Sequence, residues 1–189
     1  MKIKPCLYFL GISCFPISLM ALINIFYSSY FNYLENINSY IFVLLSSLLV
    51  GLICFYIGKK EHESITIYEQ LFLIFLIYFL IPVFISIPFY FSNYEISFID
   101  SYFESISGLT GTGFTIFEKI KNLDSPLILW RSSSQWIGGI FFLIFLVLIF
   151  SNKQVNFKMV DLSYNIEKKI NFSSNLLNVA NRIFLIYLS

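Results

Sequence analysis

The sequence predicts an all-α polytopic membrane protein in which a short re-entrant segment separates the third and fourth of four spanning helices. The first observation is composition: 58% of the 189 residues are hydrophobic, 12% are charged, and the mean hydropathy is +0.78. A soluble domain cannot bury this much apolar surface, so a bilayer is the expected solvent. The second observation is four long apolar runs, and the third is an uncharged segment rich in Gly and Thr between the last two runs.

Charge and cysteine content exclude several classes of function. The net charge is +1, which provides no basic surface for nucleic acid, so no nucleic-acid partner is expected. Cys6, Cys14 and Cys54 fall inside apolar runs and His62 is the single histidine, so neither a disulfide framework nor a zinc site is predicted. No Ser/His/Asp triad or carboxylate pair is visible, so we expect no enzyme activity and no cofactor.

Four apolar runs have the length of a membrane-spanning helix. About 20 residues are needed, because each helical residue advances about 1.5 Å through a hydrocarbon core about 30 Å thick. The runs cover residues 5–26, 40–57, 70–91 and 126–150, and residues 178–189 contain the start of a further, incomplete run. The first run also resembles a signal peptide, but no small-x-small cleavage site follows it, so an uncleaved span is favoured.

The basic residues predict the orientation of these helices. With a cytoplasmic N-terminus, nine of the twelve Lys and Arg residues lie on the cytoplasmic side, and Lys119, Lys121 and Arg131 lie outside. This bias follows the positive-inside rule. The expected organisation is two spanning helices in 1–58, a cytoplasmic loop at 59–69, a two-span repeat in 70–150, a cytoplasmic connector at 151–177, and the incomplete span at 178–189.

The segment between the third and fourth spans begins with a short helix. Ser97 and Asp100 have the S-x-x-D spacing of a helix start, and apolar residues then recur at helical spacing. Gly108 is expected to end this helix, which then covers 98–108, or roughly 16 Å. That length reaches only about half of the membrane.

A Gly- and Thr-rich stretch at 110–115 follows the half-span helix and predicts a re-entrant pore loop. Irregular backbone at membrane depth requires burial in protein or contact with a watery cavity. Glycines allow positive φ angles that align successive carbonyl oxygens, and such oxygens replace the water shell of a potassium ion. The candidate ion-binding backbone comprises Thr110, Gly111, Thr112 and Gly113. Residues 70–150 therefore form a predicted membrane-pore-loop-membrane repeat, preceded by two extra transmembrane helices.

The fourth span has recognisable start and packing signals. Ser125 is a good N-cap residue before a proline. Trp130 and Trp136 suit an aromatic belt at the outer interface. Gly138 and Gly139 remove side chains where another helix or the loop could approach closely.

Two motifs carry a resemblance to a known family. The run FESISGLTGTGF (103–114) followed by LWRSSSQWIGG (129–139) resembles the first membrane-pore-membrane repeat of the Trk/Ktr/HKT superfamily of potassium transporters. The chain is most similar to the bacterial Trk-type membrane subunit, which also has two extra spans before that repeat. The resemblance implies that Gly113 is the filter glycine used for potassium selectivity. Gly111 and Phe114 stand where Trk-type relatives often have Thr and Ala, a departure expected to soften the loop.

The resemblance also implies a setting for the protein. It implies potassium uptake across the bacterial inner membrane, with potassium as the transported ion rather than a cofactor. The family's full chain has four such repeats around one pore, so three more filter-bearing repeats are expected from a downstream segment or other chains. Membrane lipid and a cytosolic nucleotide-binding regulatory ring are the other expected partners. The alternative function is a truncated or accessory membrane subunit with no complete pore of its own.

Several features admit a second interpretation. GLTGTG also resembles a phosphate-binding loop, but such loops follow a strand and usually supply a lysine. Glu104 and Arg131 are hypothesised to pair and brace the pore helix, whereas snorkelling of Arg131 to the headgroups is the simpler alternative. Pro82 and Pro88 mark either a mild kink or, less favoured, a hinge.

Overall fold

The computed structural model describes residues 3–58 and 67–150, without the side chains of residues 3, 67 and 147–150. The elements are α1 (Ile3–Tyr30), α2 (Ile37–Gly58), α3 (Ile67–Tyr90), α4 (Phe98–Thr110), a 3₁₀ turn at Ile120–Asn122, and α5 (Ser125–Phe150). The expected connector at 151–177, the incomplete span at 178–189 and most of the loop at 59–69 lie outside the described residues.

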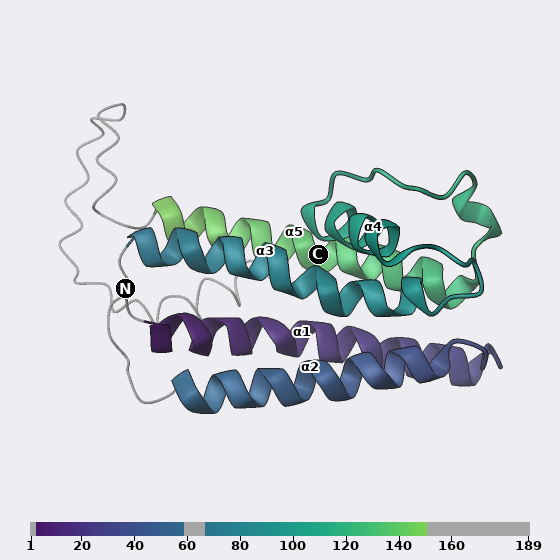
Figure 1. Cartoon of the computed structure of the whole chain (residues 1–189), viewed down its shortest axis with the longest axis horizontal. Helices are drawn as coiled ribbons and strands as arrows, with labels where there is room; N and C mark the ends of the chain where they lie inside the picture. The colour runs from purple at the N-terminus through teal and green to yellow at the C-terminus, as the bar shows by residue number, and fades with distance from the viewer. Residues whose placement is uncertain (1–2, 59–66, 151–189) are drawn as a thin grey trace.

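Four long helices lie side by side, and the described residues contain no strand (Figure 1). All four are long and apolar enough to span a membrane, and they coincide with the four predicted runs to within four residues at each end. The protein is thus an all-α polytopic membrane protein, and the predicted fold class is confirmed. The α1–α2 turn, the α4 region and the start of α5 share one end of the bundle, called here the loop end (Figure 1).

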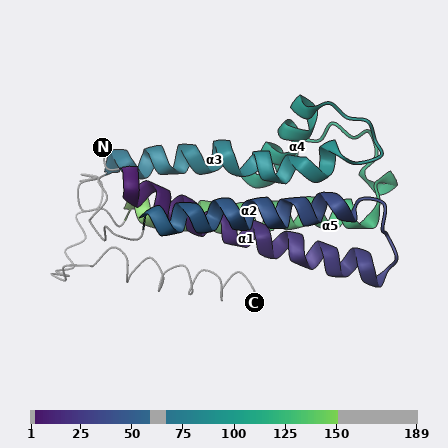
Figure 2. The same cartoon turned by 60° about the horizontal axis from the view of Figure 1, so that its bottom comes forward.

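The first two helices form a closely packed hairpin (Figure 2). Glycine makes the close approach feasible: a Cβ on Gly11 would lie 2.6 Å from the Phe55 nitrogen. A Cβ on Gly58 would lie 2.5 Å from the Tyr8 nitrogen. Small residues at such crossings allow backbones to approach in a membrane, where dispersion contacts rather than water drive helix association.

Helix α3 contains both predicted prolines and continues through them. Proline lacks an N–H and therefore loosens the hydrogen-bond ladder in the preceding turn. The carbonyl oxygens three residues before Pro82 and Pro88 both accept side-chain donors. The Tyr102 hydroxyl of α4 donates to Phe79 at 2.8 Å, and the Trp130 indole of α5 donates to Ile85 at 2.9 Å. Each proline thus lies three residues after a carbonyl that accepts a side-chain hydrogen bond from a neighbouring helix, α4 at Phe79 and α5 at Ile85.

Trp130 corrects one sequence prediction. Its side chain is fully buried and packs against Tyr40 with ring centroids 5.4 Å apart, so it is a core residue rather than part of an aromatic belt. The pattern of the sequence favours an interface because tryptophan has a polar N–H. In the structure, the α3 carbonyl satisfies that N–H inside the bundle. Trp136 is 39% exposed.

Helix α4 packs against α3 and α5 on one side of the bundle near the loop end, and the following chain returns to that end before α5 begins (Figures 1 and 2). Its 13 residues correspond to about 20 Å, which is too short to span a bilayer. The segment between α3 and α5 is therefore re-entrant in outline.

Candidate functional site

Helix α4 begins as the sequence predicts. Ser97 is the N-cap residue in extended conformation, and its Oγ accepts the N–H of Asp100 at 3.2 Å. The same Oγ lies 2.7 Å from the Asp100 carboxylate and donates to it. The cap satisfies one of the amides that would otherwise lack a partner at a helix start.

The end of α4 differs from the prediction. Gly108 does not terminate the helix; the C-cap residue is Gly111, which has a φ of 69° and donates its N–H to the Gly108 oxygen at 3.0 Å. The Thr110 hydroxyl donates to the Ile106 oxygen at 2.8 Å and so belongs to the last turn. The helix therefore extends to Thr110, and Gly108 lies inside it, at the contact with α5.

Two glycines allow α4 to lie directly on α5. A Cβ on Gly138 would lie 1.9 Å from the Leu109 carbonyl oxygen, and a Cβ on Gly108 would lie 2.4 Å from the Ser134 Oγ. Leu109 is completely buried at this contact. The close approach expected at Gly138 is therefore present.

The first helical hydrogen bonds of α5 end on the Asp124 oxygen, so Asp124 rather than Ser125 is its N-cap residue.

The turn after α4 is open on one side. Residues 110–114 are all exposed, and a Cβ on Gly111 or Gly113 would meet no atom within 4 Å. Both glycines have positive φ angles, 69° and 77°, as the proposed loop requires. Among the described residues, no hydrogen bond ends on the Gly111 or Thr112 carbonyl oxygen. The turn therefore presents backbone oxygens that accept no hydrogen bond from the part of the chain that the structure describes.

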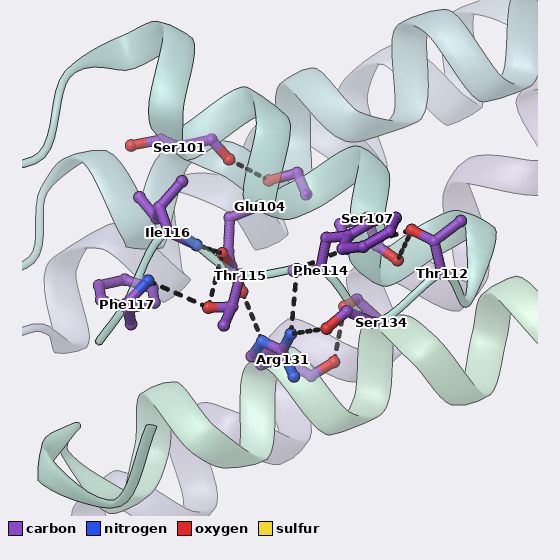
Figure 3. A network of polar contacts seen from close by, with 12 residues as sticks. Ser101, Glu104, Ser107, Thr112, Phe114, Thr115, Ile116, Phe117, Arg131 and Ser134 are labelled. Atoms are coloured by element: carbon purple, nitrogen blue, oxygen red, sulfur yellow. Dashed lines mark hydrogen bonds and ion pairs between the residues drawn. The ribbon is translucent and has the colours of Figure 1, made fainter. Parts of the chain in front are cut away.

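Side-chain hydroxyls hold the turn from the α4 side. The Thr112 Oγ1 lies 3.2 Å from the Ser107 Oγ and 3.2 Å from the Thr110 Oγ1. The Ser107 Oγ donates to the Phe114 carbonyl oxygen at 2.6 Å. Ser107 is buried and thus connects the body of α4 to both arms of the turn, as Figure 3 shows.

Glu104 binds the returning arm of the loop. It is 1% exposed, and its Oε2 accepts the Thr115 hydroxyl and the Ile116 N–H, each at 3.1 Å. The Phe117 N–H then donates to the Thr115 Oγ1 at 3.1 Å. A carboxylate with several donors suits a buried position, because each hydrogen bond replaces one lost to water.

Arg131 joins α5 to the same network (Figure 3). Its Nε donates to the Glu104 Oε1 at 2.5 Å, and its Nη2 donates to the carbonyl oxygens of Gly113 and Phe114 at 3.4 and 3.3 Å. The side chain is 10% exposed, so the guanidinium is buried in the protein and does not snorkel. The hypothesised contact between Glu104 and Arg131 is present. Both side chains also bind the returning arm of the loop, at residues 113–116.

The structure thus brings Glu104, Arg131 and Gly113 together and leaves Thr110 to Thr112 on the open side. The sequence analysis assigned no individual role to Ser107 and Ser134, and it included Thr115 only as part of the loop at 110–115. Serines and threonines are frequent in this region, so the sequence does not show which hydroxyls hold the turn. The SSSQ run of α5 and the S-x-S pair Ser105 and Ser107 of α4 are sequence signals for these hydroxyls, and both are weak.

The groups available for binding at the turn are mainly backbone carbonyl oxygens. Within residues 3–58 and 67–150 no cluster of three His, Cys, Asp or Glu side chains has the geometry to hold a metal ion. Partial negative charge is available from the C-terminus of α4 and from the free carbonyl oxygens. Such oxygens suit a weakly held monovalent cation better than a reaction that transfers protons or groups.

A helical membrane protein with a half-span helix and a glycine-lined re-entrant turn is the class that this fold and site define. A comparison with protein-family models gave no match. Curated proteins do match parts of the chain. It is 38% identical over 64 residues to an uncharacterized cation transporter of Methanocaldococcus jannaschii, a match that covers 34% of this chain and 14% of that protein.

Two further relatives are potassium uptake proteins by name. The chain is 42% identical over 57 residues to the Trk system potassium uptake protein TrkI of Halomonas elongata, covering 30% of this chain and 12% of that protein. It is 28% identical over 104 residues to the Trk system potassium uptake protein TrkH of Escherichia coli, covering 54% and 22%. The matches span about a fifth or less of these relatives. They confirm the resemblance of this chain to Trk-type proteins that its motifs predicted.

Proposed function

We propose that this chain supplies one re-entrant filter segment, and thus about one quarter of the wall, to a pore for potassium uptake. The observation that carries the proposal is the open turn after α4, where Gly111 and Gly113 have positive φ. The carbonyl oxygens of Gly111 and Thr112 have no partner within residues 3–58 and 67–150. A potassium ion exchanges its water shell for such oxygens at little cost. The names of the relatives support the same ion.

The proposed division of labour follows the two sides of the turn. Thr110, Gly111 and Thr112 would contribute carbonyl oxygens to the ion path. The sequence places Gly113 in the same set, but its oxygen accepts Arg131 Nη2 at 3.4 Å, so Gly113 would serve chiefly through the positive φ that orients the turn. Glu104 and Arg131 would hold the returning arm, because they fix the backbone of residues 113–116 by hydrogen bonds to buried charges. Arg131 would also exclude a second cation from the Gly113 oxygen, since that oxygen faces a fixed positive charge.

Uptake of ⁸⁶Rb⁺ into a host deficient in potassium transport tests the proposal. We expect uptake when the chain is expressed with the further repeats that complete a ring, and none from the chain alone. Gly113→Asp should abolish uptake, because a side chain disfavours the positive φ that orients the turn and its carboxylate adds a fixed charge beside the ion path. The matched control is Asn122→Asp, which adds a carboxylate to an exposed position of the returning loop. Equal uptake by Gly113→Asp and the parent would refute the proposal, and uptake by the chain alone would contradict the expectation that other segments complete the ring.

The orientation and the partners form part of the same proposal. The loop end would face outward in the bacterial inner membrane, with a cytoplasmic N-terminus. In the sequence, nine of the twelve Lys and Arg residues fall within the first four residues, between α2 and α3, or after α5. Single cysteines at Asn122 and at Lys59, in a variant without the native cysteines, test this with a membrane-impermeant maleimide. Only the first should react in intact cells. A cytosolic nucleotide-binding ring would contact the cytoplasmic end, and co-purification with and without nucleotide tests that.

A further inference from the structure

A cavity lined by polar and apolar residues lies away from the turn, at the loop end between the α1–α2 connection and the start of α5. Its volume is about 190 Å³, and its lining includes Glu35, Asn36, Tyr40, Asp124 and Pro126. We call it the hairpin pocket. No Lys or Arg lines it. A cavity of this size accommodates an ion together with several waters, since one water occupies about 30 Å³ in the liquid.

Tyr40 gives the hairpin pocket an unsatisfied polar group. The residue is 1% exposed, and its hydroxyl has no hydrogen-bond partner among the residues that the structure describes. Buried hydroxyls without a partner are uncommon in folded proteins, and each needs an explanation. The Tyr40 ring is fixed by its contact with Trp130, at a centroid distance of 5.4 Å, so the hydroxyl cannot easily turn away to another partner.

The charges around the hydroxyl are negative. Asp124 is close enough to Tyr40 to act on it electrostatically, and the Glu35 carboxylate also lines the pocket. Glu35 already accepts the Asn93 amide at 2.6 Å. The Asn36 side chain is occupied as well: it donates to the Pro88 oxygen at 3.0 Å and accepts from Ser39 at 2.7 Å. Asp124 is the carboxylate that acts on the Tyr40 hydroxyl, and it also interacts with the Tyr94 hydroxyl, which accepts the Asp124 N–H at 2.9 Å.

We infer that the hairpin pocket binds one monovalent alkali-metal cation between the Tyr40 hydroxyl oxygen and the Asp124 carboxylate, completed by neutral oxygens and water. A single charge matches this set of ligands, because hard divalent cations require more carboxylates or a rigid octahedral shell. The cation joins the α1–α2 turn to the N-terminus of α5, which is the end of the helix that supports the pore turn. The site is separate from the proposed filter.

Binding of ⁸⁶Rb⁺ to the purified chain in detergent, expressed without the further repeats that complete a filter, tests the inference apart from transport. We expect one saturable site per chain at constant ionic strength maintained with N-methylglucamine, and competition by potassium. Asp124→Asn should weaken binding at least about tenfold, because a charged oxygen ligand becomes neutral. Tyr40→Phe should weaken it severalfold. The matched control Glu118→Gln, at an exposed loop position outside the pocket, should bind as the parent does.

Trp130 offers an independent readout because it contacts the Tyr40 ring. In a Trp136→Phe background it is the single tryptophan, and its emission should change with the same dissociation constant as ⁸⁶Rb⁺ binding. Absence of saturable binding means that the pocket holds water only, and this would overturn the inference. So would equal affinity in the parent and in Asp124→Asn, or displacement of ⁸⁶Rb⁺ by Ca²⁺ or Mg²⁺ but not by potassium. A variant that fails to fold is recognised by its loss of the parent's elution profile, and the other substitution then decides.

Discussion

Two pairs of glycines serve opposite purposes in this protein. Gly108 and Gly138 lie at the contact between α4 and α5, where an added Cβ would meet neighbouring atoms at 2.4 and 1.9 Å. Gly111 and Gly113 lie in the open turn, where an added Cβ would meet nothing within 4 Å but the φ angles are positive. The first pair is needed for space and the second for backbone conformation.

The comparison separates stability from the proposed transport. The contact side also contains the Glu104–Arg131 pair, so changes there should first reduce the amount of folded protein. The open side makes few contacts, so changes there should first alter ion passage and leave the fold largely intact. Substitutions on the two sides can break or sharpen this distinction, and we order them by expected effect.

The largest effect is expected for Arg131→Met, which leaves the Glu104 carboxylate buried without its cationic partner. Removal of one member of a buried ion pair typically costs about 3–5 kcal/mol of stability. The melting temperature of the purified protein in detergent measures this loss. Arg131→Lys keeps the charge but not the planar fork that reaches Gly113 and Phe114, so it should recover only part of the loss. A melting temperature unchanged in Arg131→Met would show that the pair does not support the fold.

Exchange of the two charges sharpens the same point. The double variant Glu104→Arg with Arg131→Glu restores opposite charges, but four hydrogen bonds are lost with the original arrangement. They run from Thr115 and Ile116 to Glu104 and from Arg131 to Gly113 and Phe114. Rescue should therefore be partial at best. Full rescue in the thermal unfolding assay would mean that charge alone matters.

Gly138→Ala is expected to have the next largest effect. The new methyl group would approach the Leu109 carbonyl oxygen at 1.9 Å, and backbone on one side must move. Overpacking of this kind typically costs about 1–3 kcal/mol. Size-exclusion profiles and melting temperatures should both show the loss. Gly139→Ala is the matched control at the next position, and a loss as large as that of Gly138→Ala would locate the cause elsewhere than the Leu109 contact.

Gly108→Ala should cost less, because the atom in its way is the Ser134 hydroxyl rather than backbone. Ser134→Ala removes that atom, together with its hydrogen bond to the Arg131 oxygen at 2.7 Å. The double variant should be more stable than the sum of the single losses predicts, by about 0.5–3 kcal/mol for contacting residues. Strict additivity in the melting data would contradict the geometry of this contact.

The smallest effect on stability is expected for Gly113→Ala. The φ angle of 77° costs a side chain about 1–2 kcal/mol, and no clash adds to it. Gly113→Asn should cost less, because asparagine tolerates this region better. ⁸⁶Rb⁺ uptake by the completed pore should nevertheless fall much further than stability does. Proportional losses in uptake and melting temperature would erase the proposed difference between the two sides.

Much of the fold follows from local signals in the sequence. The four spans were predictable because about 20 apolar residues in a row leave few alternatives to a membrane helix. The α4 start was predictable from Ser97, since N-capping depends on a side chain and an amide a few residues apart. The end of α4 was not, because glycine ends a helix at one position and permits contact at another. Gly108 and Gly111 cannot be told apart without the neighbouring helix.

The candidate site divides in the same way. The turn at 110–113 was predictable because an uncharged Gly- and Thr-rich stretch between two apolar spans indicates irregular backbone rather than a continuing helix. The pairing of Glu104 with Arg131 was open to two interpretations, since a lone arginine near a helix end is as compatible with snorkelling as with burial. Its further bonds to Gly113 and Phe114 depend on where the returning arm lies.

The sequence alone determined that this chain is a helical membrane protein with a half-span helix and a glycine-containing turn, because hydrophobic length, capping and backbone freedom are local properties. Tertiary structure decided which glycines give space and which give conformation, where Trp130 donates its N–H, and which loop carbonyls Arg131 occupies. These outcomes depend on distances between helices that are far apart in the chain, and no local pattern specifies such distances.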